Sequence, residues 1–161
     1  MNILTFSEQT LFYRGFLPGN NSVGQWVTNT RETASIYGIV ASIGTIRPIK
    51  ILDISDKVVV LFIRNLFIRY VKAINPPFGV DVYDTVIKTR DSGITERNSS
   101  FIGDTHVLNA LLYSSKEGWL PPDIDGFGAD ELPTDTTMTN HHYEICLFKP
   151  TEVTQHLQTL D

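Results

Sequence analysis

The sequence predicts an α+β fold made of short strands and longer helices. Short apolar runs bounded by Gly, Pro and Asn are typical of strands. Two longer stretches keep their polar or apolar residues on one side of a helix, which is typical of amphipathic helices. The chain has 161 residues, about the length of one domain, and contains no internal repeat. We therefore expect a single domain over residues 1–161.

The composition is that of an ordinary globular protein, with 42% hydrophobic and 19% charged residues. The formal net charge of −5 argues against general nucleic-acid binding, because contacts to phosphates need a surplus of Lys and Arg. Cys146 is the only cysteine, which excludes an internal disulfide and fits a reducing compartment. The first residues lack the basic and apolar regions of a secretory signal. The apolar run 58–63 is far shorter than a membrane span of roughly 18 residues. We expect a cytoplasmic protein with no membrane partner.

The first elements along the chain are two strands and a helix. Residues 11–16 are apolar and aromatic around one cation, and we expect them to share a sheet with a second strand, residues 24–28. One of residues 28–30 can cap the helix that follows. We expect that helix from about Arg31 to Ser42.

The middle of the chain predicts a strand and then a longer helix. Residues 47–54 alternate as a strand does, and Ser55 or Asp56 can cap the next helix. Residues 57–72 could form a buried strand at their start, but a one-sided polar face over that length favours a helix. The polar positions of that face are Lys57, Arg64, Asn65, Arg69 and Lys72.

The last third contains a helix, a long loop and a strand. The break at residues 75–77 leaves the stretch to Ser99 unassigned. Residues 101–113 carry a helical apolar stripe, with Ser99 or Ser100 as its cap. Residues 117–140 are rich in Pro, Gly, Asp and Thr, so we expect a long loop, which in a compact domain is usually functional or disordered. Residues 142–148 follow as a strand.

Two charged residues occupy positions where strands are often apolar: Arg14 in the first strand and Glu144 in the last. Either alone is explained by a solvent-facing position on a sheet. Arg14 and Glu144 become candidate functional residues when they are considered with Trp26 and Tyr37, two aromatics on either side of a strand-to-helix turn. That spacing can form two walls of a slot for a flat ring.

This set resembles the ADP-ribosyltransferase fold, the group of the bacterial mono-ADP-ribosylating toxins and the poly(ADP-ribose) polymerases. Tyr13-Arg14-Gly15 looks like the first-strand motif, with the Arg of the toxin-like branch. Trp26-Val27-Thr28 and Ala34-Ser35-Ile36-Tyr37 are similar to the polymerase-like strand and helix. Glu144, which opens an apolar strand after a long loop, looks like the catalytic glutamate. The motifs therefore combine features of both branches.

The resemblance implies mixed or antiparallel β-sheets with flanking helices, and NAD as substrate. The implied activity is mono-ADP-ribosyl transfer, a glycosyltransferase reaction. It cleaves the nicotinamide–ribose bond and moves ADP-ribose to a macromolecular acceptor, in the first place a protein. Three alternatives stay open: an NAD glycohydrolase with water as acceptor, an inactive NAD-binding or interaction module of this fold, and a structural domain with no NAD site.

The resemblance also implies roles for seven residues. The catalytic set is Glu144, Arg14 and Thr28. Glu144 would bind the ribose 2′-hydroxyl and stabilise the oxocarbenium-like transition state, as carboxylates do in glycoside cleavage. Thr28 would orient Glu144, and Arg14 would hold the pyrophosphate with its planar guanidinium. The NAD-binding residues are Tyr13, Arg14, Gly15, Trp26, Thr28 and Tyr37.

Within this binding set, Gly15 would let its backbone approach the nicotinamide amide. Trp26 and Tyr37 would flank the ring. The loop 121–142 would face and select the acceptor. Arginine-modifying members carry a Glu two residues before the catalytic Glu, whereas this chain has His142, so the acceptor is not indicated.

Other candidate sites have simpler explanations. Adjacent His141 and His142 would point to opposite faces of a strand, so we expect no metal site. Residues 123–126 resemble a calcium loop only superficially, because Gly stands at the fourth position rather than the sixth, and we interpret them as a turn. Cys146 lies in an apolar strand and is expected in the core.

Overall fold

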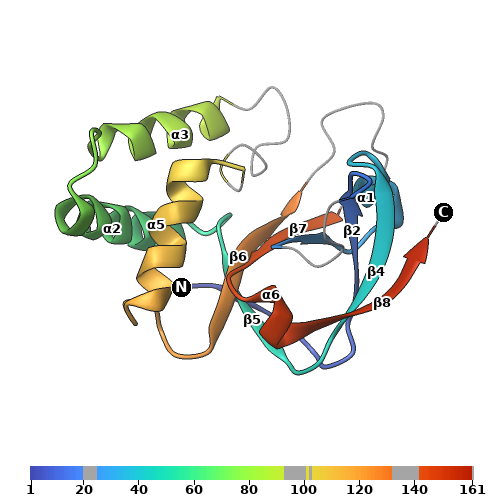
Figure 1. The fold of residues 1–161 in the computed structure, drawn as a ribbon. Helices are drawn as coiled ribbons and strands as arrows, with labels where there is room; N and C mark the ends of the chain where they lie inside the picture. The colour runs from blue at the N-terminus through green and yellow to red at the C-terminus, as the bar shows by residue number, and fades with distance from the viewer. Residues whose placement is uncertain (20–24, 93–100, 102, 132–141, 161) are drawn as a thin grey trace.

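The computed structural model describes residues 1–19, 25–92, 101, 103–131 and 142–160, and it is an α+β structure. Its strands are β1 (Ile3–Phe6), β2 (Leu11–Phe16), β3 (Trp26–Thr28), β4 (Ile39–Thr45), β5 (Ile49–Asp53), β6 (Ile124–Glu131), β7 (His142–Leu147) and β8 (Thr154–Leu160). Its helices are α1 (Arg31–Ser35), α2 (Lys57–Ile74), α3 (Asp81–Asp91), α5 (Thr105–Lys116) and α6 (Pro150–Val153). Figure 1 shows α2, α3 and α5 gathered on one side of the molecule, and the strands with the short α1 on the other.

The eight strands form one mostly antiparallel sheet in the order β1-β5-β6-β7-β3-β2-β4-β8. Only the β5–β6 pair is parallel among the described strands. The predicted partnership of residues 11–16 with a strand at residues 24–28 is confirmed for residues 26–28, and Gly24 lies outside the described residues. β2 and β3 share a single register pair, Tyr13 with Thr28. The sheet is therefore held weakly at this point, between the β3–β7 ladder and the β2–β4 ladder.

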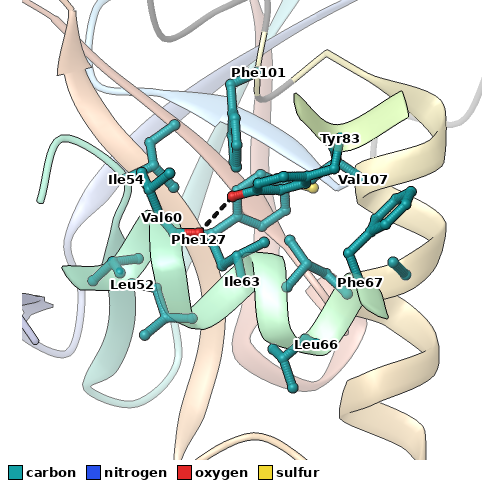
Figure 2. Close-up of a cluster of buried hydrophobic side chains, with 14 of the residues drawn as sticks. Leu52, Ile54, Val60, Ile63, Leu66, Phe67, Tyr83, Phe101, Val107 and Phe127 are labelled. Carbon is teal, nitrogen blue, oxygen red and sulfur yellow. Dashed lines mark hydrogen bonds between the residues drawn. The ribbon is translucent and has the colours of Figure 1, made fainter. Parts of the chain in front are cut away.

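One hydrophobic core lies between the sheet and the helices α2, α3 and α5. Asp56 caps α2 by accepting a hydrogen bond from the Val58 amide, and Asn75 ends the helix in the left-handed region at φ 51°. In Figure 2 the Tyr83 hydroxyl of α3 donates a hydrogen bond to the Val60 carbonyl of α2, at 2.6 Å. The labelled members of this core are Leu52, Ile54, Val60, Ile63, Leu66, Phe67, Tyr83, Phe101, Val107 and Phe127.

A second core lies on the other face of the sheet. It joins Phe12 of β2 and Ile43 of β4 to Ile51 of β5 and Ile145 of β7. Three strands separate β2 from β5 in the sheet order, so side chains from both can meet only because the sheet curves. Along β7 the residues alternate between the two cores, as strand geometry requires.

The structure corrects the predicted helix over residues 31–42. Helix α1 ends at Ser35, and residues 39–45 form β4. The chain turns at Gly38, whose φ of +125° suits glycine and whose missing side chain leaves room for the Phe16 carbonyl. β-Branched residues dominate the segment that follows, and they favour a strand along β2.

The predicted loop over residues 117–140 is confirmed for residues 117–123 and is wrong for residues 124–131. Residues 124–131 form β6, a central strand between β5 and β7. Gly126 and Gly128 give this segment the composition of a loop. A Cβ on Gly126 would overlap the backbone of Cys146 in β7, and a Cβ on Gly128 would overlap the backbone of Glu144. They mark a close approach of two strands. Residues 132–140 lie outside the described residues.

Three of the remaining predicted helices and strands are confirmed, and one helix is shifted. The predicted strands 47–54 and 142–148 are confirmed as β5 and β7, and the predicted helix 57–72 is confirmed as α2. The unassigned stretch after residue 77 contains α3. The predicted helix 101–113 is shifted, since α5 runs from Thr105 to Lys116 with Asp104 as its cap. The proposed caps Ser99 and Ser100 lie outside the described residues.

Candidate functional site

A pocket of about 380 Å³ opens where β2, β3 and β7 meet helix α1. The structure brings together in its lining all seven residues that the sequence predicted for the site, although their roles stay predictions. The lining consists of Tyr13, Arg14, Gly15, Trp26, Val27, Thr28, Thr33, Ala34, Tyr37, Gly103 and Glu144. The volume falls within the roughly 300–1,000 Å³ typical of small-molecule sites.

Strand register builds the floor of the pocket. Tyr13 pairs with Thr28 across β2 and β3, and Thr28 pairs with Glu144 across β3 and β7. Residues directly opposite one another in antiparallel strands present their side chains on the same face. Three residues far apart in the sequence therefore form one row across the sheet.

Helix α1 forms one wall of the pocket. It begins at the cap Thr30, whose hydroxyl accepts a hydrogen bond from the Thr33 amide at 3.3 Å. A Cβ on Gly15 would lie 2.8 Å from the Cβ of Tyr37 and would overlap the Ala34 carbonyl oxygen. The missing side chain of Gly15 thus allows α1 to lie directly on β2. Gly15 also lines the pocket, and the approach of its backbone to the nicotinamide amide stays a prediction.

The two aromatics of the predicted slot lie in different environments. Trp26 of β3 is half-buried and packs against the core under the helices. Tyr37 lies in the turn after α1 and is 54% exposed, so it stands at the solvent side of the pocket. Both rings therefore line the pocket, Trp26 from the core side and Tyr37 from the solvent side.

Two buried polar atoms of the pocket make no hydrogen bond to any described residue: Arg14 Nε and Thr28 Oγ1. Thr28 is 6% exposed. Desolvation by burial lowers the pKa of the Arg14 guanidinium, which means that the folded protein offers this cation less stabilisation than water does. Buried polar groups are nearly always hydrogen-bonded, so both atoms suit a polar ligand.

Glu144 lies at the pocket with its side chain 12% exposed. The resemblance implies that Thr28 orients this carboxylate, but the Thr28 hydroxyl makes no hydrogen bond to it. The structure places the His142 imidazole there, with its Nε2 3.5 Å from Glu144 Oε1. His142 is 1% exposed. Sequence reasoning missed this contact, although the two-residue spacing on a strand was a usable signal.

Gly103 is the other lining residue from a distant segment, just before α5, and nothing in the sequence singled it out. The segment predicted to face the acceptor, residues 121–142, is β6 over its described part, with β6 joined to β5 and β7. Its residues 132–141 lie outside the described residues. The expected acceptor loop is therefore wrong for residues 124–131.

The alternative sites have structural roles. Arg47 contacts both carboxylate oxygens of the buried Asp125, at 2.7 and 3.2 Å, and this hydrogen bonding raises the pKa of Arg47. The predicted turn over residues 123–126 is limited to Asp123, because residues 124–126 belong to β6. Cys146 is buried in the core as predicted, and burial raises the pKa of its thiol. Among the described residues no group of three His, Cys, Asp or Glu side chains could hold a metal ion.

Comparisons with protein-family models, with curated proteins and with solved structures found no match. Within the part of the chain that the structure describes, no helix has the length and apolar character needed to cross a membrane.

Proposed function

We propose that the pocket binds NAD and that the protein cleaves its nicotinamide–ribose bond, transferring one ADP-ribose unit to a macromolecular acceptor. One observation supports this most: the acid Glu144 and the two unpartnered polar atoms of Arg14 and Thr28 line one pocket together with the aromatics Trp26 and Tyr37. The sequence resemblance to ADP-ribosyltransferases gives the substrate, and the pocket contains the residues that it implies.

The reaction breaks the bond between the nicotinamide nitrogen and ribose C1′. The electron pair of that bond leaves with nicotinamide, which departs neutral because it was cationic in NAD. The ribose carries the developing positive charge, and a nucleophile of the acceptor then bonds to C1′ and loses its proton to solvent. A carboxylate beside C1′ stabilises this charge, and Glu144 is the acid of the pocket lining.

The other lining residues would bind and orient NAD. Trp26 and Tyr37 would flank the nicotinamide ring. Arg14 would bind the pyrophosphate, because a phosphate oxygen at Nε would satisfy a buried donor and restore the stabilisation that burial removes from the cation. Thr28 Oγ1 would donate to or accept from a polar group of the same ligand.

Binding of NAD is tested by thermal unfolding of the purified protein with increasing NAD. A ligand that binds only the folded state raises Tm as its concentration increases. At one hundred times its Kd, the ligand adds about 2.7 kcal/mol to the free energy of unfolding. ADP-ribose and nicotinamide are added separately, to assign the two ends of the pocket. Absence of any shift up to millimolar NAD would contradict the proposal.

Transfer is tested next with NAD labelled in its adenylate part. The protein is incubated with labelled NAD in a cell lysate, and label is followed into protein and nucleic-acid fractions. Label retained by protein after denaturation supports transfer to a protein. Free ADP-ribose as the sole product would indicate an NAD glycohydrolase, and binding without any product would indicate an inactive module.

A further inference from the structure

His142 is a buried titratable side chain beside the pocket. It lies in β7 two residues before Glu144, and alternate residues of a strand point to the same face. Its Nε2 is 3.5 Å from Glu144 Oε1, within the distance of an ion pair when the imidazole is protonated. At 1% exposure the imidazole is closed to solvent.

This burial separates His142 from the acceptor. A residue that recognises a macromolecule must present polar atoms to it, whereas the imidazole of His142 is covered. Its Nε2 lies near the carboxylate of Glu144, which is partly exposed in the pocket. The acceptor is therefore recognised by other residues.

We propose that His142 is a positioning residue that holds the Glu144 carboxylate toward the pocket; this rests on the function proposed above for the site. A glutamate side chain has several rotatable bonds, and its rotamer freedom must be restricted for the carboxylate to face a ribose. Thr28 Oγ1 makes no hydrogen bond to a described residue, and His142 Nε2 approaches Glu144 at ion-pair distance without hydrogen-bond geometry. The low local dielectric of a buried site strengthens the polar contact between His142 and Glu144.

The test compares two variants of similar size, His142→Gln and His142→Leu. The Gln amide nitrogen reaches about as far along the side chain as Nε2, whereas Leu fills the space without a polar atom. Misplacement of a catalytic group by about 1 Å costs on the order of 10²-fold in rate. We expect His142→Leu to lower kcat for nicotinamide release about 100-fold with KM for NAD unchanged, and His142→Gln to recover most of kcat.

A third variant shows whether His142 acts through Glu144. In a Glu144→Gln background, His142→Leu is expected to lower the residual rate no further, because the carboxylate to be positioned is gone. Independently of activity, the ¹⁵N signals of the His142 imidazole, assigned by their loss in His142→Gln, are expected to move in Glu144→Gln.

Three results would overturn the inference: wild-type kcat in His142→Leu, equal losses in His142→Leu and His142→Gln that follow their Tm values, or His142 signals insensitive to Glu144→Gln. If the wild type cleaves NAD and one of these results is also found, the role of His142 is contradicted and the proposed function stands. A wild-type protein that neither binds nor cleaves NAD would remove the proposed function and the inference together.

Discussion

Replacement of Gly15 by Ala tests how closely α1 lies on β2. The new Cβ would lie 2.8 Å from the Cβ of Tyr37, whereas carbon atoms in contact stay about 3.5–4.0 Å apart. It would also overlap the carbonyl oxygen of Ala34, which is backbone and cannot rotate away. Helix α1 and the turn that carries Tyr37 must therefore retreat by roughly 1 Å.

We expect Gly15→Ala to destabilise the protein by about 1–3 kcal/mol, the usual cost of overpacking. For a chain of this length each kcal/mol lowers Tm by about 2–4 °C. The assay is calorimetric unfolding, followed by an NAD titration of the folded variant, which should bind more weakly because a pocket wall has moved. Gly79→Ala is the matched control, since its Cβ would meet only the end of the Asp81 side chain at 3.1 Å.

Gly15→Ala with the Tm of the wild type would refute this reasoning. A stable variant would mean that α1 does not rest on β2, and the described wall of the pocket would be wrong. A large Tm loss in Gly79→Ala as well would show that the effect is not specific to the α1 contact.

Three further predictions follow from single side chains. Tyr83→Phe removes the donor to the Val60 carbonyl and should cost about 1 kcal/mol in unfolding free energy; a variant as stable as the wild type in urea would contradict it. Arg14→Ala should weaken NAD binding about 10- to 100-fold, with Arg14→Lys intermediate, and an unchanged Kd by calorimetry would exclude Arg14 from the site. Backbone hydrogen bonds from Asn2 and Val58 lower the pKa of Asp56, so its stabilisation is present at neutral pH and is lost as pH falls from about 4 through the folded-state pKa. Asp56→Ala should accordingly have a lower Tm than the wild type at pH 7, and the gap should close toward pH 2; a gap independent of pH would contradict the capping role.

Sequence reasoning succeeded where one pattern dominated. Helix α2 was predictable because its polar face persists over five turns, and the cap Asp56 stands just before it. The strands β2 and β7 were predictable from short runs of apolar and aromatic residues. Because β3 lies between these two strands, the register alone brings Tyr13, Thr28 and Glu144 into one row.

Sequence reasoning failed where packing overrode local composition. Strand β6 carries Gly126 and Gly128, which suggest a loop until the nearness of β7 is known. The end of α1 depended on the positive φ of Gly38, which no periodicity reveals. Likewise nothing in the sequence places α1 against Gly15.

The site shows the same division between pattern and packing. The residue types of the pocket could be recognised one by one, but the pairing of His142 with Glu144 depends on burial that the sequence does not state. The absence of a Thr28 hydrogen bond to Glu144 likewise depends on side-chain geometry within the strand pair.

The central claim, that Glu144 cleaves the nicotinamide–ribose bond, is tested most directly by nicotinamide release from NAD, measured by chromatography for the wild type and for Glu144→Gln at equal concentration. The substitution keeps the size of the side chain and removes its charge. We expect release by the wild type, a loss of at least 100-fold in Glu144→Gln, on the order of the effect of removing one electrostatic group, and nearly unchanged NAD binding. Equal release by both proteins would contradict the account.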